Sequence, residues 1–210
     1  MAITKLDSGR IVLSNADYFL VTPYVKENEI GSTTYDIVNI VADTLSFTPD
    51  DNSVNAKEWE FGDTPLFENI TLGKIQFAAT CVDFSNDVME AIFGWTKGAS
   101  GAMYAPNGYK DLYAVVEVGF KNEGVAVVVP KLKLNSKATI STLKTGTGEA
   151  QLAGTAYNAE IKVGEDSPVS APMAFVLRGE SEATYSIMVG EDEVSFKTGN
   201  KADSGVQAGA

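Results

Sequence analysis

Apolar and polar residues alternate with a period of two through most of this chain, and this pattern limits the possible folds more than any other feature. From Leu112 to Phe120, one phase is purely apolar and the other includes Glu117. Neighbouring side chains of a β-strand point to opposite faces, so the pattern is typical of strands. Turn-forming residues at 121–124 then lead into a second run, 125–134, and the two runs together predict a hairpin.

Similar patterns predict strands over most of the remaining sequence. The expected strands are Ala16–Val25, Tyr35–Phe47, Ile70–Val82, Lys137–Leu143, Glu149–Ile161, Met173–Arg178, Thr184–Val189 and Glu193–Thr198. Short strands at regular spacing favour a two-sheet β-sandwich or a barrel. No linker divides the chain, so we expect one domain over residues 1–198 and a flexible tail at 199–210.

One segment has a helical period instead. Its apolar residues fall at i, i+3, i+4 and i+7, at Val88, Ala91, Ile92 and Trp95. Asp83 or Ser85 could cap the start, and Gly98 could end it. We therefore expect one flanking helix of about three turns, at about residues 85–96, whose apolar face covers the sheets.

A long polar segment separates two strong strand signals, and we expect it to be a protruding hairpin loop at about residues 48–65. Its candidate contact residues are Asp50, Asp51, Lys57, Glu58, Trp59, Glu60 and Asp63. The only basic stretch of the chain contains Lys131, Lys133, Lys137 and Lys144. Two interpretations of this stretch remain open: a solvated sheet face, or a surface complementary to the acidic loop of another subunit.

The composition excludes several classes of function. The chain has no histidine, which removes the Ser-His and Cys-His nucleophile pairs and histidine-ligated metals. The single cysteine, Cys81, lies on the apolar phase of a strand, where a packed core residue is favoured over a nucleophile. Two carboxylates could still hydrolyse a glycoside, but nothing marks out a pair. We expect no enzymatic activity, no metal and no cofactor.

Charge limits the possible partners in the same way. The chain has 28 acidic and 16 basic side chains and a formal net charge of −12. This balance disfavours tight binding of nucleic acid and attraction to an anionic membrane. Lys5, Asp7 and Arg10 interrupt the N-terminal apolar run, so we expect no export signal and no membrane association.

Three local patterns carry a resemblance to a known family. They are the run from Asp83 to Gly94 (DFSNDVMEAIFG), the Pro-interrupted run from Val129 to Leu134 (VPKLKL), and the small-residue run from Gly148 to Ala156 (GEAQLAGTA). Together with the order of strand, long acidic loop, strand, helix and further strands, the chain resembles the major tail tube proteins of tailed bacteriophages over roughly residues 10–190.

This resemblance implies a structural virion protein, assembled in the host cytoplasm. It implies a two-sheet sandwich whose hexameric rings stack head to tail into a tube, with the polar loop as the ring-stacking element. Partners would be further copies of the chain and other tail or connector proteins, and double-stranded DNA would pass through the lumen without tight binding. An acidic wall suits this role because it repels DNA phosphates.

Two other classes of protein remain as alternatives. A surface adhesin or a pilus-type β-sandwich subunit also polymerises through strand edges. A carbohydrate-binding sandwich would need clustered exposed aromatic residues, and the candidates, Trp59, Phe61, Tyr104 and Tyr109, are divided between two segments.

Overall fold

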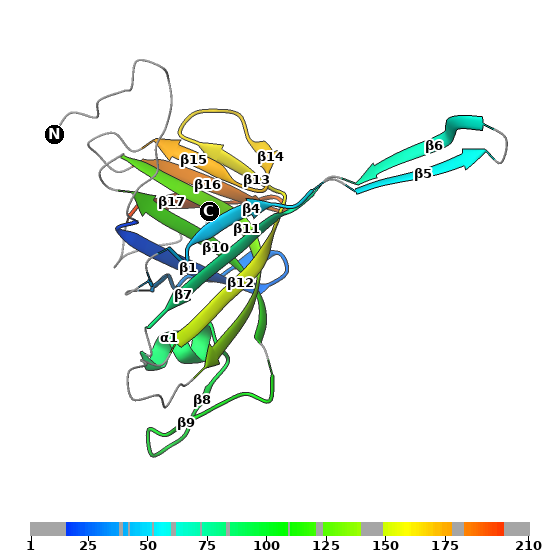
Figure 1. The fold of residues 1–210 in the computed structure, drawn as a ribbon. Helices are drawn as coiled ribbons and strands as arrows, with labels where there is room; N and C mark the ends of the chain where they lie inside the picture. Colours follow the sequence, from blue (N-terminus) through cyan, green and yellow to red (C-terminus); the bar gives the residue numbers. More distant parts are fainter. Residues whose placement is uncertain are drawn as a thin grey trace.

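The computed structural model describes residues 16–37, 40–41, 43–51, 53–59, 62–71, 73–82, 85–108, 110–120, 124–139, 149–177 and 183–199. The expectation of a mainly β protein is confirmed (Figure 1), and the described residues form antiparallel sheets and one short helix. No sheet closes on itself among the strands that the structure describes.

The largest sheet has nine strands. Seven of them follow the order β2 (Glu29–Ile30), β1 (Tyr18–Lys26), β10 (Lys110–Phe120), β11 (Val125–Thr139), β12 (Glu149–Tyr157), β7 (Ile75–Cys81), β4 (Ser46–Pro49). The other two strands pair outside this path: β3 (Tyr35–Asp36) with β1, and β15 (Ala174–Leu177) with β11.

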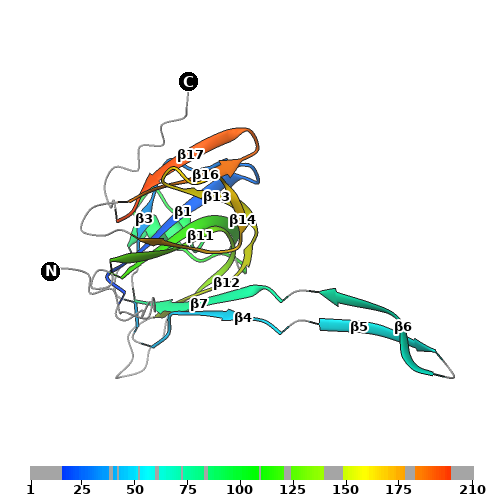
Figure 2. The same cartoon turned by 90° about the horizontal axis from the view of Figure 1, so that it is seen from above.

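A second sheet has four strands, in the order β14 (Val169–Ala171), β13 (Ala159–Val163), β16 (Thr184–Val189), β17 (Asp192–Lys197). Figure 2 shows β16 and β17 on one side of the body, with β4 and β7 on the other. Only Asn158 separates β12 from β13, so the expected single strand at 149–161 is divided between the two sheets.

The central hairpin of β10 and β11 is buried on both faces, which the alternation did not predict. On one face, Val116 and Val118 join the larger core cluster, which also contains residues of the helix. On the other face, Val115 packs in a second cluster with Tyr185 and Ile187 of β16. Residues of both phases of the pattern are therefore buried where strands of the four-stranded sheet pack against the nine-stranded sheet.

The helix is shorter than expected. In place of a helix at about residues 85–96, α1 spans Asn86–Ala91, with Ser85 at the N-cap but without a side-chain capping hydrogen bond. Gly94 has φ +71°, a left-handed conformation that is typical of the residue just after a helix. The stop signal is therefore Gly94 and not Gly98.

The expected apolar face of the helix segment does point into the core. Val88 and Ile92 are buried, and Trp95 packs partly buried against the same cluster. Met89 and Phe93 are buried as well. The buried surface is wider than the predicted stripe, because Met89 and Phe93 lie beside Val88 and Ile92 and extend the buried face by one residue at each turn.

Two of the expected strands are broken. The run 35–47 forms only β3 and β4, with an isolated bridge between Ile40 and Cys81 in between. The run 70–82 is interrupted at Gly73, where the sequence predicts a phase shift, and it divides between β6 (Gly62–Thr71) and β7. Of the strand expected at 137–143, residues 137–139 belong to β11 and 140–143 lie outside the described residues.

The segment expected as a loop at about 48–65 contains paired strands. After β4, β5 (Ser53–Trp59) pairs antiparallel with β6, which continues well beyond residue 65. In Figures 1 and 2 this hairpin points away from the body. A second, shorter hairpin, β8 (Thr96–Lys97) and β9 (Met103–Tyr104), follows α1.

Of the flexible tail expected at 199–210, only its first residue is described. Gly199 lies two residues after the end of β17 and donates its backbone N–H to Glu117. Residues 200–210 lie outside the described part of the chain.

Candidate assembly surfaces

The base of the β5–β6 hairpin is tightly built. Asp50 and Asp51, two of the predicted contact residues, are exposed at this point. The Asp50 N–H donates to the carbonyl oxygen of Lys74 at 2.8 Å, and Gln76 Nε2 donates to Asp50 Oδ2 at 2.6 Å. Any Cβ at Gly73 would collide with the carbonyl oxygen of Asp50, so glycine allows the two chains to approach this closely.

The other predicted contact residues lie along the hairpin itself. Lys57, Glu58 and Trp59 are on β5 and Asp63 is on β6, whereas Glu60 lies outside the described residues. The pairing of the two strands shifts register on both sides of Glu58. This irregularity marks a bulge, which bends and twists a hairpin locally.

The predicted basic stretch is only partly described. Lys131 and Lys133 lie on β11 and are half-buried, while the intervening Leu132 and the following Leu134 are fully buried, as the alternation predicts. In the pairing of β11 with β12, Lys137 stands opposite Gln151. Lys144 lies outside the described residues.

Lys133 forms an ion pair within its own chain. Its Nζ lies 3.3 Å from Asp111 Oδ2 on β10, and the two side chains are 37% and 60% exposed. The hydrogen bond to Asp111, followed by the charge of that carboxylate, raises the pKa of Lys133. The pair is open to solvent, so its contribution to stability is small.

Two tyrosines lie beside these lysines. Tyr113 of β10 and Tyr157 of β12 make an edge-to-face contact, with 6.1 Å between ring centroids. Lys131 Nζ lies 5.1 Å from the Tyr113 centroid, and Lys74 Nζ lies 4.6 Å from that of Tyr157. We call the surface made by Lys74, Tyr113, Lys131, Lys133 and Tyr157 the Lys–Tyr face.

Only two of these five residues, Lys131 and Lys133, were predicted from the sequence as contact residues. Tyr113 and Asp111 share the polar phase of β10, a local signal that could have placed them together. Tyr157 and Lys74 join the face through strand register: Lys131 pairs with Tyr157, and Thr155 pairs with Gln76. Strand pairing of this kind is set by tertiary contacts and leaves no short sequence motif.

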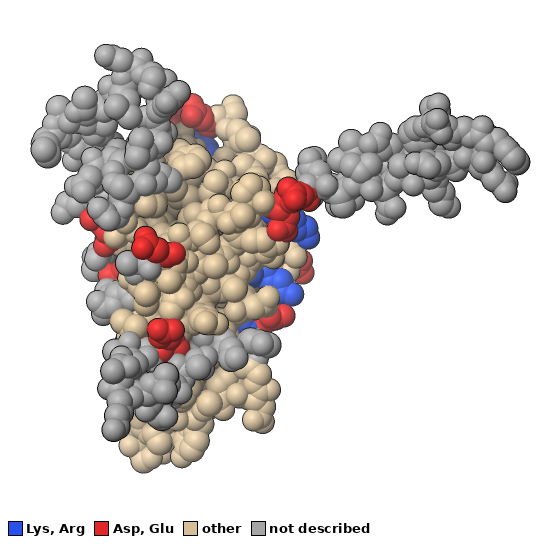
Figure 3. All heavy atoms as spheres, viewed as in Figure 1, with Lys and Arg blue, Asp and Glu red and all other residues tan. Residues whose placement is uncertain are grey.

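Figure 3 shows Lys or Arg atoms beside Asp or Glu atoms on the rim of the body, close to where the hairpin begins. Two consecutive side-chain hydrogen bonds lead from this surface toward the base of the hairpin. Thr155 Oγ1 donates to Gln76 Oε1 at 2.9 Å, and Gln76 in turn holds Asp50. The base of the hairpin is thus connected to the sheet that carries the Lys–Tyr face.

The ends of both sheets have strand edges with no partner among the described strands. β4 ends the larger sheet, and β17 ends the smaller one. β4 has only four residues and finishes at Pro49, while β17 carries Asp192, Glu193 and Lys197. Short edges, proline and charge all discourage indiscriminate strand pairing. The edges are therefore open but protected.

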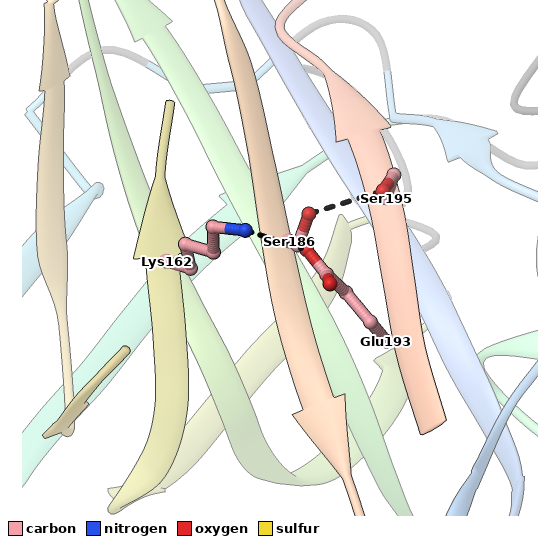
Figure 4. Close-up of polar contacts among 4 residues, drawn as sticks. All are labelled: Lys162, Ser186, Glu193 and Ser195. Carbon is pink, nitrogen blue, oxygen red and sulfur yellow. Dashed lines mark hydrogen bonds and ion pairs between the residues drawn. The ribbon is translucent and has the colours of Figure 1, made fainter. Parts of the chain in front are cut away.

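The four-stranded sheet carries a polar cluster of Lys162, Ser186, Glu193 and Ser195 (Figure 4). Lys162 Nζ lies 3.4 Å from Glu193 Oε1, and the hydroxyls of Ser186 and Ser195 are 3.0 Å apart. The hydrogen bond from Ser186, then the charge of Lys162, lowers the pKa of Glu193. The four residues lie on three neighbouring strands, β13, β16 and β17, and their contacts form a cross-strand polar ladder.

The remaining candidates from the sequence do not converge. Cys81 is completely buried in the larger core cluster. Tyr104, which is 60% exposed, lies on β9, whereas Trp59 lies on β5, and Figure 1 places these hairpins far apart. Phe61 and Tyr109 lie outside the described residues.

In the part of the chain that the structure describes, no three histidine, cysteine, aspartate or glutamate residues are grouped to hold a metal ion. No helix among the described residues is both long enough and apolar enough to cross a membrane.

Comparison with known proteins adds no family assignment. No protein-family model matches this chain, and the search of curated proteins also gives no match.

Proposed function

We propose that this chain is a structural subunit that assembles with copies of itself into stacked hexameric rings, and that these rings form a phage tail tube through which the genome passes. The nine-stranded and four-stranded sheets would be the two layers of a tail-tube-like sandwich, with α1 on its flank. Other tail or connector proteins would join the ends of the tube.

The observation that carries this proposal is the β5–β6 hairpin. Its two strands pair with each other and with no other strand that is described. A two-stranded hairpin by itself is marginally stable in water at best. It therefore needs a second surface to become ordered, and a projecting hairpin with a tightly held base is suited to contact a neighbouring subunit.

Charge and composition support the same role. A net charge of −12 per subunit would give the assembled tube an acidic character, which repels DNA phosphates and lets a duplex slide. The protected edges of β4 and β17 would keep the free subunit from aggregating before it meets its partner.

Negative-stain electron microscopy and sedimentation velocity of the purified protein test the proposal. We expect rings or tubes with a central hole, and no shift of duplex DNA in a gel at low ionic strength, where a basic groove would bind most tightly. Thin fibres without a hole would favour the pilus-type or adhesin alternative. Monomers at every concentration, or tight salt-sensitive DNA binding, would rule the proposal out.

Limited proteolysis offers a second test, aimed at the hairpin. A protease should cut residues 48–71 readily in free subunits and poorly in assembled material, because contact with a neighbour orders the segment. Equal cutting in both states would show that the hairpin takes no part in assembly.

A further inference from the structure

The Lys–Tyr face is a concentration of positive charge on a strongly acidic protein. The ammonium groups of Lys74 and Lys131 lie over two tyrosine rings, and Lys133 stands opposite Tyr113 in the β10–β11 pairing. One nearby carboxylate, Asp111, pairs with Lys133, and another, Asp50, accepts a hydrogen bond from Gln76. Lys74 and Lys131 lie over the Tyr157 and Tyr113 rings, which holds their positive charge at this surface.

The sheet beneath this face is rigid. Leu132 and Leu134, which alternate with the lysines on β11, are completely buried in the larger core cluster. β11 also pairs with both β10 and β12 at this level. The lysines and tyrosines thus project from a well-packed central part of the sheet. Binding of a partner would therefore not incur the entropy cost of ordering this backbone.

The β5–β6 hairpin has the opposite charge. Between Ser53 and Thr71 the sequence contains Glu58, Glu60, Asp63 and Glu68 but only one basic residue, Lys57. The hairpin starts next to the Lys–Tyr face of its own chain and points away from the body (Figures 1 and 2). Its own Lys–Tyr face is therefore out of reach of the tip, and the face of another copy is the available cationic surface.

We propose that the Lys–Tyr face is the docking surface for the acidic β5–β6 hairpin of a second copy of this chain. This inference rests on the proposed self-assembly, and it names the two surfaces through which one copy contacts the next. Carboxylates of the hairpin would pair with the lysines while the tyrosine rings supply flat contact area, a combination that selects the register of one subunit on the next.

Charge reversal on both sides of the contact tests this pairing. Lys131→Glu with Lys133→Glu should raise the concentration needed for assembly about tenfold or more, since each contact then opposes like charges. Glu58→Lys with Asp63→Lys should have the same effect. A chain with all four changes should regain assembly, because the four reversed positions again join acidic to basic side chains.

Lys26→Glu is the matched control. Lys26 is an exposed lysine at the C-terminal end of β1, where β1 pairs with β2, and it forms an ion pair with Glu29, so its reversal should leave assembly unchanged. Circular dichroism confirms that each variant is folded. If the face reversal perturbs folding, the neutral pair Lys131→Gln and Lys133→Gln replaces it.

Zero-length carbodiimide crosslinking of a mixture of ¹⁴N- and ¹⁵N-labelled wild-type chains gives an independent measurement. Intermolecular crosslinks from Lys74, Lys131 or Lys133 to Glu58, Asp63 or Glu68 are expected. The docking assignment would be overturned if the face-reversed variant assembled as well as the wild type, or if the four-change chain did not regain assembly. Neither result would contradict the formation of tubes.

Other results would separate the docking site from the proposed function. The absence of any self-association by the wild type would overturn both. Binding of a glycan that Tyr113→Ala abolishes, or of duplex DNA that the lysine reversal abolishes, would assign the face to a different ligand and overturn the docking assignment.

Discussion

Gly199 donates its backbone N–H to Oε1 of Glu117 at 2.8 Å, although 82 residues separate the two in sequence. The same carboxylate accepts hydrogen bonds from the hydroxyls of Tyr18, at 2.6 Å, and Tyr185, at 2.9 Å. Glu117 is only 3% exposed. One side chain of β10 thus connects β1, β16 and the end of β17.

Replacing Glu117 should show how much this connection contributes. Glu117→Leu leaves three donors, two of them buried, without their acceptor, and at roughly 1–3 kcal/mol for each unmet buried group, we expect a loss of several kcal/mol in the free energy of unfolding. Glu117→Gln keeps one acceptor oxygen and should cost less. Urea denaturation measures both, and a Glu117→Leu variant as stable as the wild type would contradict the network.

Gly119 should be intolerant of a side chain because Tyr18 lies across it. The two residues are direct partners in the β1–β10 pairing, and a Cβ at position 119 would overlap the tyrosine ring. Gly119→Ala should therefore displace Tyr18 and cost about 1–3 kcal/mol.

A double-mutant cycle provides the control for this effect. In a Tyr18→Ala background the ring is gone, so Gly119→Ala should cost much less than it does in the wild type. Equal costs in the two backgrounds would mean that the glycine matters for another reason.

The protein should lose stability in alkaline solution. Burial raises the pKa of Tyr24 to about 12, and burial followed by the charge of Glu117 raises the pKa of Tyr185 well above 10. The unfolded chain releases these protons near pH 10, whereas the folded chain retains them. Their contribution is thus complete below pH 10 and declines as the pH rises toward 12.

Melting temperatures between pH 8 and pH 12 measure this decline. Tyr24→Phe removes one of the titrating groups together with its hydrogen bond to the Pro130 carbonyl oxygen. It should lower stability slightly at pH 8 and make the alkaline decline shallower. Tyr104→Phe, at an exposed position, is the control and should follow the wild-type curve.

The helix segment provides a test of the core. Ile92 is completely buried, and its carbonyl oxygen accepts a hydrogen bond from Ser136 Oγ at 2.5 Å. Ile92→Asp would bury a charge and should prevent folding, whereas Glu90→Gln, at an exposed position two residues earlier, should be nearly silent. Circular dichroism melts distinguish the two, and a folded Ile92→Asp protein would contradict the packing.

Local patterns in the sequence were sufficient to predict the class of fold and many of its buried residues. Leu132 and Leu134 are buried and Lys131 and Lys133 face outward because strand periodicity is a property of neighbouring residues. The apolar spacing of Val88 and Ile92 placed the helix on the core for the same reason. The end of the helix was predicted at the wrong glycine, since Gly94 and Gly98 both follow it closely and, of these two, only Gly94 adopts the left-handed conformation.

The tertiary structure decided what lies over each strand. Val115 and Glu117 occupy the phase of β10 that the sequence marks as the more polar one, yet both are buried because the four-stranded sheet covers them. The Lys–Tyr face likewise depends on the register between strands that are distant in sequence. Periodicity is encoded locally and can be read from a chain alone, whereas register and sheet packing follow from the simultaneous burial of distant segments, which no local pattern specifies.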